Sequence, residues 1–164
     1  MIESIINQLS SFPALAVALI SFLPISELRG AIPTGILIFN MDIWVVFFIS
    51  ILGNILIIPF VFLFLDTLHH LLIKWPFYDK TFAKFLNKIQ HRKEKVEKNY
   101  ETYGILALAI FVAIPLPITG AWTGTLIAWL MKLKRTRSFF AMCLGIIIAA
   151  FVVLMLTVGL KTLF

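Results

Sequence analysis

Residues 24–33 read Pro-Ile-Ser-Glu-Leu-Arg-Gly-Ala-Ile-Pro and lie inside an apolar stretch that covers residues 12–39. The two prolines and Gly30 are expected to break a helix here, because proline lacks a backbone N–H and glycine is conformationally free. Glu27 and Arg29 are charged, and charged side chains at membrane depth face a protein interior or a wet cavity. The stretch therefore predicts a segment that enters a membrane, bends and returns.

The composition of the whole chain indicates an integral membrane protein. Hydrophobic residues make up 61% of the 164 residues and charged residues 13%, whereas soluble domains carry roughly 45–50% and about 25%. Residues 43–65 and 138–160 are clean apolar stretches, each long enough to cross about 30 Å of hydrocarbon as a helix. The net charge of +6 comes largely from basic stretches between the apolar ones. We read these as topology signals and lipid contacts, and expect no nucleic-acid partner.

The order of elements repeats along the chain. The broken stretch 12–39 precedes the clean stretch 43–65, and a second broken stretch, 103–131, precedes 138–160. In this alignment Pro24 falls on Pro115, while the glycines correspond only after small shifts. We predict one membrane domain, residues 1–164. Its parts are repeat 1 at 12–65, a linker at 66–102 and repeat 2 at 103–160.

The basic residues predict the topology. The linker 66–102 and the loop 132–137 are both rich in Lys and Arg, which is typical of cytoplasmic loops. If residues 103–131 crossed the membrane once, these two segments would lie on opposite sides. We therefore predict that 103–131 is a re-entrant helical hairpin and, by the same logic, that 12–39 enters from the other face. The predicted fold is all-α, an inverted repeat in which each half is a re-entrant hairpin plus a transmembrane helix.

The linker is predicted to form a basic amphipathic helix. Aromatic and aliphatic residues recur on one helical face, and Lys80, Lys84, Lys88 and Arg92 recur on another. Such a helix lies in the membrane interface and favours anionic lipids. The alternative is a solvated charge run without an apolar contact.

The two hairpin tips supply the candidate site. Arg29 is suited to bind an anionic group, and Glu27 is suited to take up and release a proton. The alternative is that Glu27 only ties down the hairpin, and a direct pair between the two requires irregular backbone. The opposing tip has hydroxyls and glycines but no charge. The predicted site residues are Glu27, Arg29, Gly30, Pro33, Pro115, Pro117, Thr119, Gly120, Thr123 and Gly124.

Other chemistry is not indicated. No nucleophile motif, phosphate-binding loop or metalloenzyme signature is present, so we expect no enzyme activity, no metal and no cofactor. Asp66, His69 and His70 lack a further metal ligand. Asn54, inside a clean apolar stretch, is expected to hydrogen-bond across a helix interface. Cys143 is the only cysteine, which excludes an intramolecular disulfide.

The segments SELRGAIP at 26–33, GN at 53–54 and PLPITGAWTG at 115–124 resemble the putative small multidrug export proteins. That family is similar to the wider DedA/VTT membrane-protein superfamily. The resemblance implies facing re-entrant hairpins, frequent dimers and, in some members, movement of lipids or undecaprenyl phosphate. It assigns functional positions to the tip residues given above, except Thr123. DedA-type second hairpins carry an arginine near the tip, whereas residues 115–124 are uncharged.

Three functions follow from these observations. The first is a transporter in a prokaryotic plasma membrane that exports a small molecule, coupled to protons through Glu27. The second is a lipid or undecaprenyl-phosphate transporter or scramblase of DedA type that uses Arg29 for the headgroup. The third is a non-transporting membrane scaffold. Two transmembrane helices cover little of the polar edge of each hairpin, so we also expect a homodimer. Membrane lipids are expected as further partners.

Overall fold

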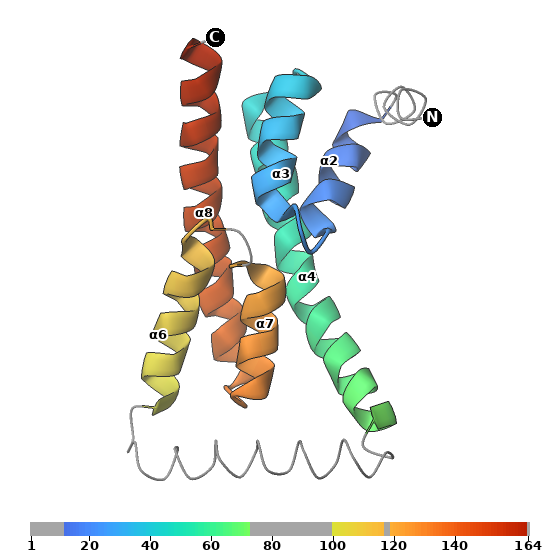
Figure 1. Cartoon of the computed structure of the whole chain (residues 1–164), viewed down its shortest axis with the longest axis vertical. Coiled ribbons are helices and arrows are strands. Elements are labelled where there is room, and N and C mark those ends of the chain that lie inside the picture. Colours follow the sequence, from blue (N-terminus) through green and yellow to red (C-terminus); the bar gives the residue numbers. More distant parts are fainter. Residues whose placement is uncertain (1–11, 73–99, 117–118, 164) are drawn as a thin grey trace.

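The computed structural model describes residues 12–72, 100–116 and 119–163 (Figure 1). All regular elements in these ranges are helices. Most of the predicted linker helix, and Pro117 of the predicted site, lie outside the described residues. The flanks of the linker belong to its neighbours, because helix α4 continues to Leu72 and helix α6 already begins at Tyr100.

The first broken stretch folds back on itself. Helix α2 (Pro13–Phe22) is followed by a short turn and by helix α3 (Glu27–Pro33), which continues as the π-helix η1 (Thr34–Ile38). The Ser26 hydroxyl holds the turn by donating to the Ile20 carbonyl at 2.8 Å. Glu27 has a φ of 47°, a left-handed conformation that is uncommon for residues other than glycine.

The turn is shorter than the sequence predicts. The prolines suggested a tip extending from Pro24 to Pro33, but the chain is helical again from Glu27. Pro33 lies inside this helical run with φ −61° and ψ −41°, because the fixed φ of proline is compatible with a helix. Its missing N–H interrupts the hydrogen-bond ladder, and the helix widens to η1 directly after it.

The second broken stretch also folds back. Helix α6 (Tyr100–Ala113) is followed by non-helical residues at 114–116 and 119–120 and by helix α7 (Ala121–Leu130). Figure 1 shows α6 and α7 at the opposite end of the molecule from α2 and α3, with the two turns meeting near the middle. A residue with positive φ follows the second arm of each hairpin. It is Asn40, at 48°, in the first hairpin and Lys132, at 50°, in the second.

Two long helices cover the length of the molecule. They are α4 (Ile43–Leu72) and α8 (Arg135–Leu163), and among the described residues these two are long and apolar enough to cross a membrane. Many of their large apolar side chains point outward, for example Leu56 and Leu63 of α4 and Leu156 of α8. Such contiguous apolar surface is rare on soluble proteins. The chain is a membrane protein.

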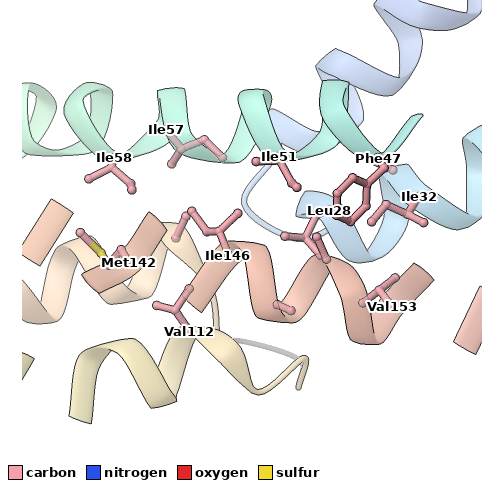
Figure 2. Packing of buried hydrophobic residues seen from close by; sticks show 14 of the residues in the cluster. Leu28, Ile32, Phe47, Ile51, Ile57, Ile58, Val112, Met142, Ile146 and Val153 are labelled. Atoms are coloured by element: carbon pink, nitrogen blue, oxygen red, sulfur yellow. The ribbon is translucent and has the colours of Figure 1, made fainter. Parts of the chain in front are cut away.

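The core lies between α4 and α8 (Figure 2). Figure 2 shows Ile57 and Ile58 of α4 opposite Met142 and Ile146 of α8, all fully buried. The first hairpin adds Leu28 and Ile32, and the second adds Val112. Both hairpins are therefore fixed to the same pair of long helices. Asn54, as predicted, bonds across a helix interface, donating from Nδ2 to the Ser21 carbonyl at 2.9 Å.

A glycine in each long helix allows the first arm of its hairpin to approach closely. A Cβ at Gly145 of α8 would lie 2.7 Å from the carbonyl oxygen of Ala109. A Cβ at Gly53 of α4 would overlap the Ser21 hydroxyl and lie 3.4 Å from the Ala18 carbonyl oxygen. At Gly145 the helix backbones can pack at this distance only because α8 has no side chain there, whereas at Gly53 the missing side chain leaves room for the Ser21 hydroxyl.

We expect Gly145→Ala to lower the melting temperature of the detergent-solubilised protein, because α6 and α8 must separate to admit the methyl group. Overpacking of this kind costs about 1–3 kcal/mol. The matched control is Gly159→Ala in the same helix, where an added Cβ meets nothing within 4 Å. Equal melting temperatures for the two variants would show that the close α6–α8 contact does not form.

Candidate functional site

The candidate site lies where the turns of the two hairpins meet. Glu27, the first residue of α3, has its side chain only 4% exposed. Its Oε1 accepts a hydrogen bond from the backbone N–H of Trp122 at 3.3 Å. Trp122 is in the first turn of α7, where unpaired N–H groups and the helix dipole favour a negative charge. The carboxylate of one hairpin thus occupies the helix N-terminus of the other.

Gly120 makes this contact possible. It precedes α7 in an extended conformation, and a Cβ at this position would overlap the carboxylate of Glu27. The Gly120 N–H donates to the Thr123 hydroxyl at 3.1 Å, which fixes the start of α7 locally. Two of the predicted site residues therefore shape the position that the carboxylate occupies.

Arg29 connects the two hairpins a second time. Its Nη2 lies 3.6 Å from Glu27 Oε2 and donates to the Thr119 hydroxyl at 3.4 Å, and its Nη1 donates to the Leu116 carbonyl. The positive φ of Glu27 supplies the irregular backbone that a pair two residues apart requires. The Arg29 Nε is buried and has no hydrogen-bond partner in the described part of the chain.

Trp122 contributes more than packing. Its indole Nε1 donates to the carbonyl of Phe22, the last residue of α2, at 3.0 Å. Its ring contacts the rings of Phe22 and Phe60 edge-on, with centroids 6.3 and 6.1 Å away. Trp122 therefore joins the end of α2 to the start of α7.

Several predicted site residues lie outside this cluster. Gly30 faces Ser26 within its own hairpin, where a Cβ would lie 2.7 Å from the Ser26 Cβ. Gly124 packs against Val112, where an added Cβ would lie 2.8 Å from the Val112 Cγ2. Pro33 is inside the helical run of the first hairpin, away from its turn. These residues shape the hairpins, whereas Glu27, Arg29, Thr119 and Gly120 meet at the junction.

The structure also shows a polar cluster that the sequence did not predict. Asp66 of α4 accepts from the indole Nε1 of Trp129 at 2.9 Å and forms two 2.8 Å contacts with the guanidinium of Arg135. The cluster ties α4 to α7 and α8. Its partners come from distant segments, so no local sequence pattern marks it. The described residues contain no group of three or more His, Cys, Asp or Glu that could hold a metal ion.

The arrangement at the junction has a clear chemical capacity. Glu27 is a buried carboxyl group with proton-accepting oxygens, and Arg29 is a cation that also donates to a neutral carbonyl and a neutral hydroxyl. Removal from water disfavours charged forms unless they are paired. Protonation of Glu27, or arrival of an anion at Arg29, would therefore change how strongly the two hairpins attract each other.

Comparison with known proteins gives one match. The model of a family described as "Putative small multi-drug export protein" matches residues 27–152, which is more than half of the chain. The matched range begins at Glu27 and contains Arg29, the second turn and most of α8. No curated protein and no solved structure matches the sequence. The comparison supports transport rather than catalysis and leaves the similarity to the DedA/VTT superfamily as a prediction. The chain belongs to the family of putative small multi-drug export proteins.

Proposed function

We propose that this protein is a proton-coupled secondary transporter that exports a small molecule through a site at the junction of its two hairpins. The observation that carries the proposal is the buried contact of Glu27 with Arg29 and with the start of α7. Ionisable groups at membrane depth are costly, and they usually serve a substrate or proton pathway.

An inverted repeat of two re-entrant hairpins would give this site access from both faces. The repeat is supported by matching contacts, since Gly53 approaches Ala18 in the first half and Gly145 approaches Ala109 in the second. Ala18 and Ala109 are 91 positions apart, and the two glycines are 92 apart. The residues with positive φ that follow the hairpins, Asn40 and Lys132, are also 92 apart.

Transport would proceed by movement of one hairpin against the other. With Glu27 ionised, its carboxylate attracts Arg29 and the N-terminus of α7, and the junction is closed. A proton on Glu27 removes the negative charge and weakens both attractions, which frees the junction to open and admit substrate. Loss of the proton on the other side restores the closed state. Alternating exposure of this kind is typical of transporters built from inverted repeats.

The test is a flux measurement on the purified protein in liposomes. We expect an imposed pH gradient to drive accumulation of a fluorescent cationic dye, and collapse of the gradient by a protonophore to stop it. Equal dye accumulation with and without the pH gradient would contradict proton coupling. Scrambling of fluorescent phospholipids without any dye flux would replace the export proposal with lipid transport of the DedA type. Absence of both activities would favour the scaffold.

We further propose a homodimer in which each copy covers the hairpin turns of the other. Ile25 at the first turn is 98% exposed, and Leu116 at the second is 55% exposed. Irregular backbone at membrane depth must be covered by protein or line a wet cavity. In a Cys143→Ala background, Ile25→Cys is expected to form disulfide-linked dimers in membranes, and Met155→Cys, also exposed, serves as the control. Equal cross-linking at the two positions would contradict this interface.

A further inference from the structure

The start of α8 combines cationic side chains with apolar grooves. Arg135 and Arg137 lie in its first turn, which contains no acidic residue, and Lys134 precedes it. Arg135 pairs with Asp66, while Lys134 and Arg137 lie 3.4 and 3.6 Å from Glu101. Unpaired N–H groups at a helix N-terminus add further positive potential. This surface is distinct from the junction of the hairpins.

Two grooves extend from these arginines on either side of Phe140. The first, of about 620 Å³, begins at Arg135 and is lined on its apolar part by Pro59, Leu63 and Phe139. The second, of about 440 Å³, begins at Arg137 and is lined by Ile105, Ala141 and Leu144. Phe140 lines both grooves and is 67% exposed.

Both grooves extend from the charged end of the molecule toward its middle. On α4 the first groove extends from Asp66 back to Pro59, and on α8 the second extends from Arg137 to Leu144. Seven residues of helix correspond to about 10 Å. Each groove therefore has a cationic head and an apolar body that runs along the outside of a membrane-crossing helix.

The charges at this end select an anion. A cavity of about 320 Å³ adjoins the first groove, and its lining includes Lys132, Arg135 and Asp66. Among the residues that the structure describes here, the cations Lys134, Arg135 and Arg137 outnumber the two carboxylates of Asp66 and Glu101 that they contact. Basic pockets beside membrane helices bind anionic lipid headgroups.

We propose that the start of α8 binds one two-chain anionic phospholipid. Its phosphate is held between Arg135 and Arg137, whose planar guanidinium groups suit phosphate oxygens. Its two acyl chains lie in the two grooves, separated by the ring of Phe140. Bound in this way, the lipid joins α4, α6 and α8 at the end where the ion pairs of Asp66 and Glu101 already hold them. The proposal does not depend on transport through the hairpin junction.

The test is native mass spectrometry of the protein released from mild detergent with phosphatidylglycerol or phosphatidylcholine of identical chains. The wild type is expected to retain phosphatidylglycerol at least about fivefold better, since a surface cation near an anionic lipid contributes that much. Arg137→Gln should remove most of this preference. Ala141→Phe, which fills the second groove, should lower retention of both lipids. Lys161→Gln, at the far end of α8, is the matched control and should behave as wild type.

Three results would overturn the proposal. Equal retention of the two lipids by the wild type would exclude an anion-selective site. An equal loss in Lys161→Gln and Arg137→Gln would mean that general charge, not this surface, holds the lipid. Complete displacement of phosphatidylglycerol by millimolar inorganic phosphate would identify a site for free phosphate without a role for the grooves. The comparison of phosphatidylglycerol with phosphatidylcholine on the wild type still tests the proposal if a variant fails to fold.

Discussion

Glu27→Gln is expected to abolish flux driven by a pH gradient, lowering it at least about 100-fold, the lower end of the range by which a positioned acid or base acts. Glutamine has nearly the same volume, and its carbonyl oxygen can still accept from the Trp122 N–H at the start of α7. It cannot bind or release a proton at neutral pH. The substitution therefore removes the titrating group while leaving the junction filled.

The matched control for this prediction is Glu101→Gln. Glu101 is a carboxylate beside Lys134 and Arg137 at the start of α8, with its side chain 29% exposed. It is distant from the junction of the hairpins. We expect its variant to transport like the wild type. Melting temperatures of both variants verify folding. If Glu27→Gln keeps full gradient-driven flux, Glu27 has a purely structural role and another group must carry the proton.

Gly120→Ala is expected to separate the two hairpin turns. A methyl group at 120 would occupy the position of the Glu27 carboxylate, so this side chain must leave its place beside Trp122 and Arg29. Hydrogen bonds to charged groups contribute about 1.5–3 kcal/mol each, and we expect a destabilisation of that size. Thermal unfolding in detergent, followed by tryptophan fluorescence, measures it.

A double variant isolates the cause. Once Glu27 is replaced by alanine, no carboxylate remains for the Cβ at 120 to displace. Gly120→Ala should then cost much less in the Glu27→Ala background than in the wild type, because residues in contact show non-additive effects. Strict additivity would indicate that Gly120 acts through its own backbone conformation and not through the carboxylate.

The sequence predicted that the chain reverses twice, but it did not predict the residues at which each turn begins and ends. The prolines and glycines of both broken stretches marked two reversals, and the chain reverses between α2 and α3 and between α6 and α7 (Figure 1). Pro33 was wrongly expected to belong to a turn. Proline disrupts a helix through its missing N–H, but its φ is helical, so the fold can keep it by widening the ladder into η1.

The charged half of the site was visible in the sequence, and its partners were not. Glu27 and Arg29 stood out because they are costly at membrane depth. Their contacts include the Trp122 N–H and the Leu116 carbonyl. These are backbone groups: every residue has the carbonyl and every residue except proline has the N–H, so residue identity carries almost no signal for them. The Asp66–Arg135 pair was missed because its two members lie 69 positions apart.

The most direct test of the central claim, two hairpins that enter from opposite faces and meet at Glu27 and Arg29, is the sidedness of three positions. Single cysteines at Asn40, Thr102 and Lys134 in a Cys143→Ala background are labelled with an impermeant maleimide in intact cells and in inverted vesicles. The account predicts that 102 and 134 label from the cytoplasmic side and 40 from the other. Labelling of 102 and 134 from opposite sides would make residues 103–131 a single crossing and would contradict the account.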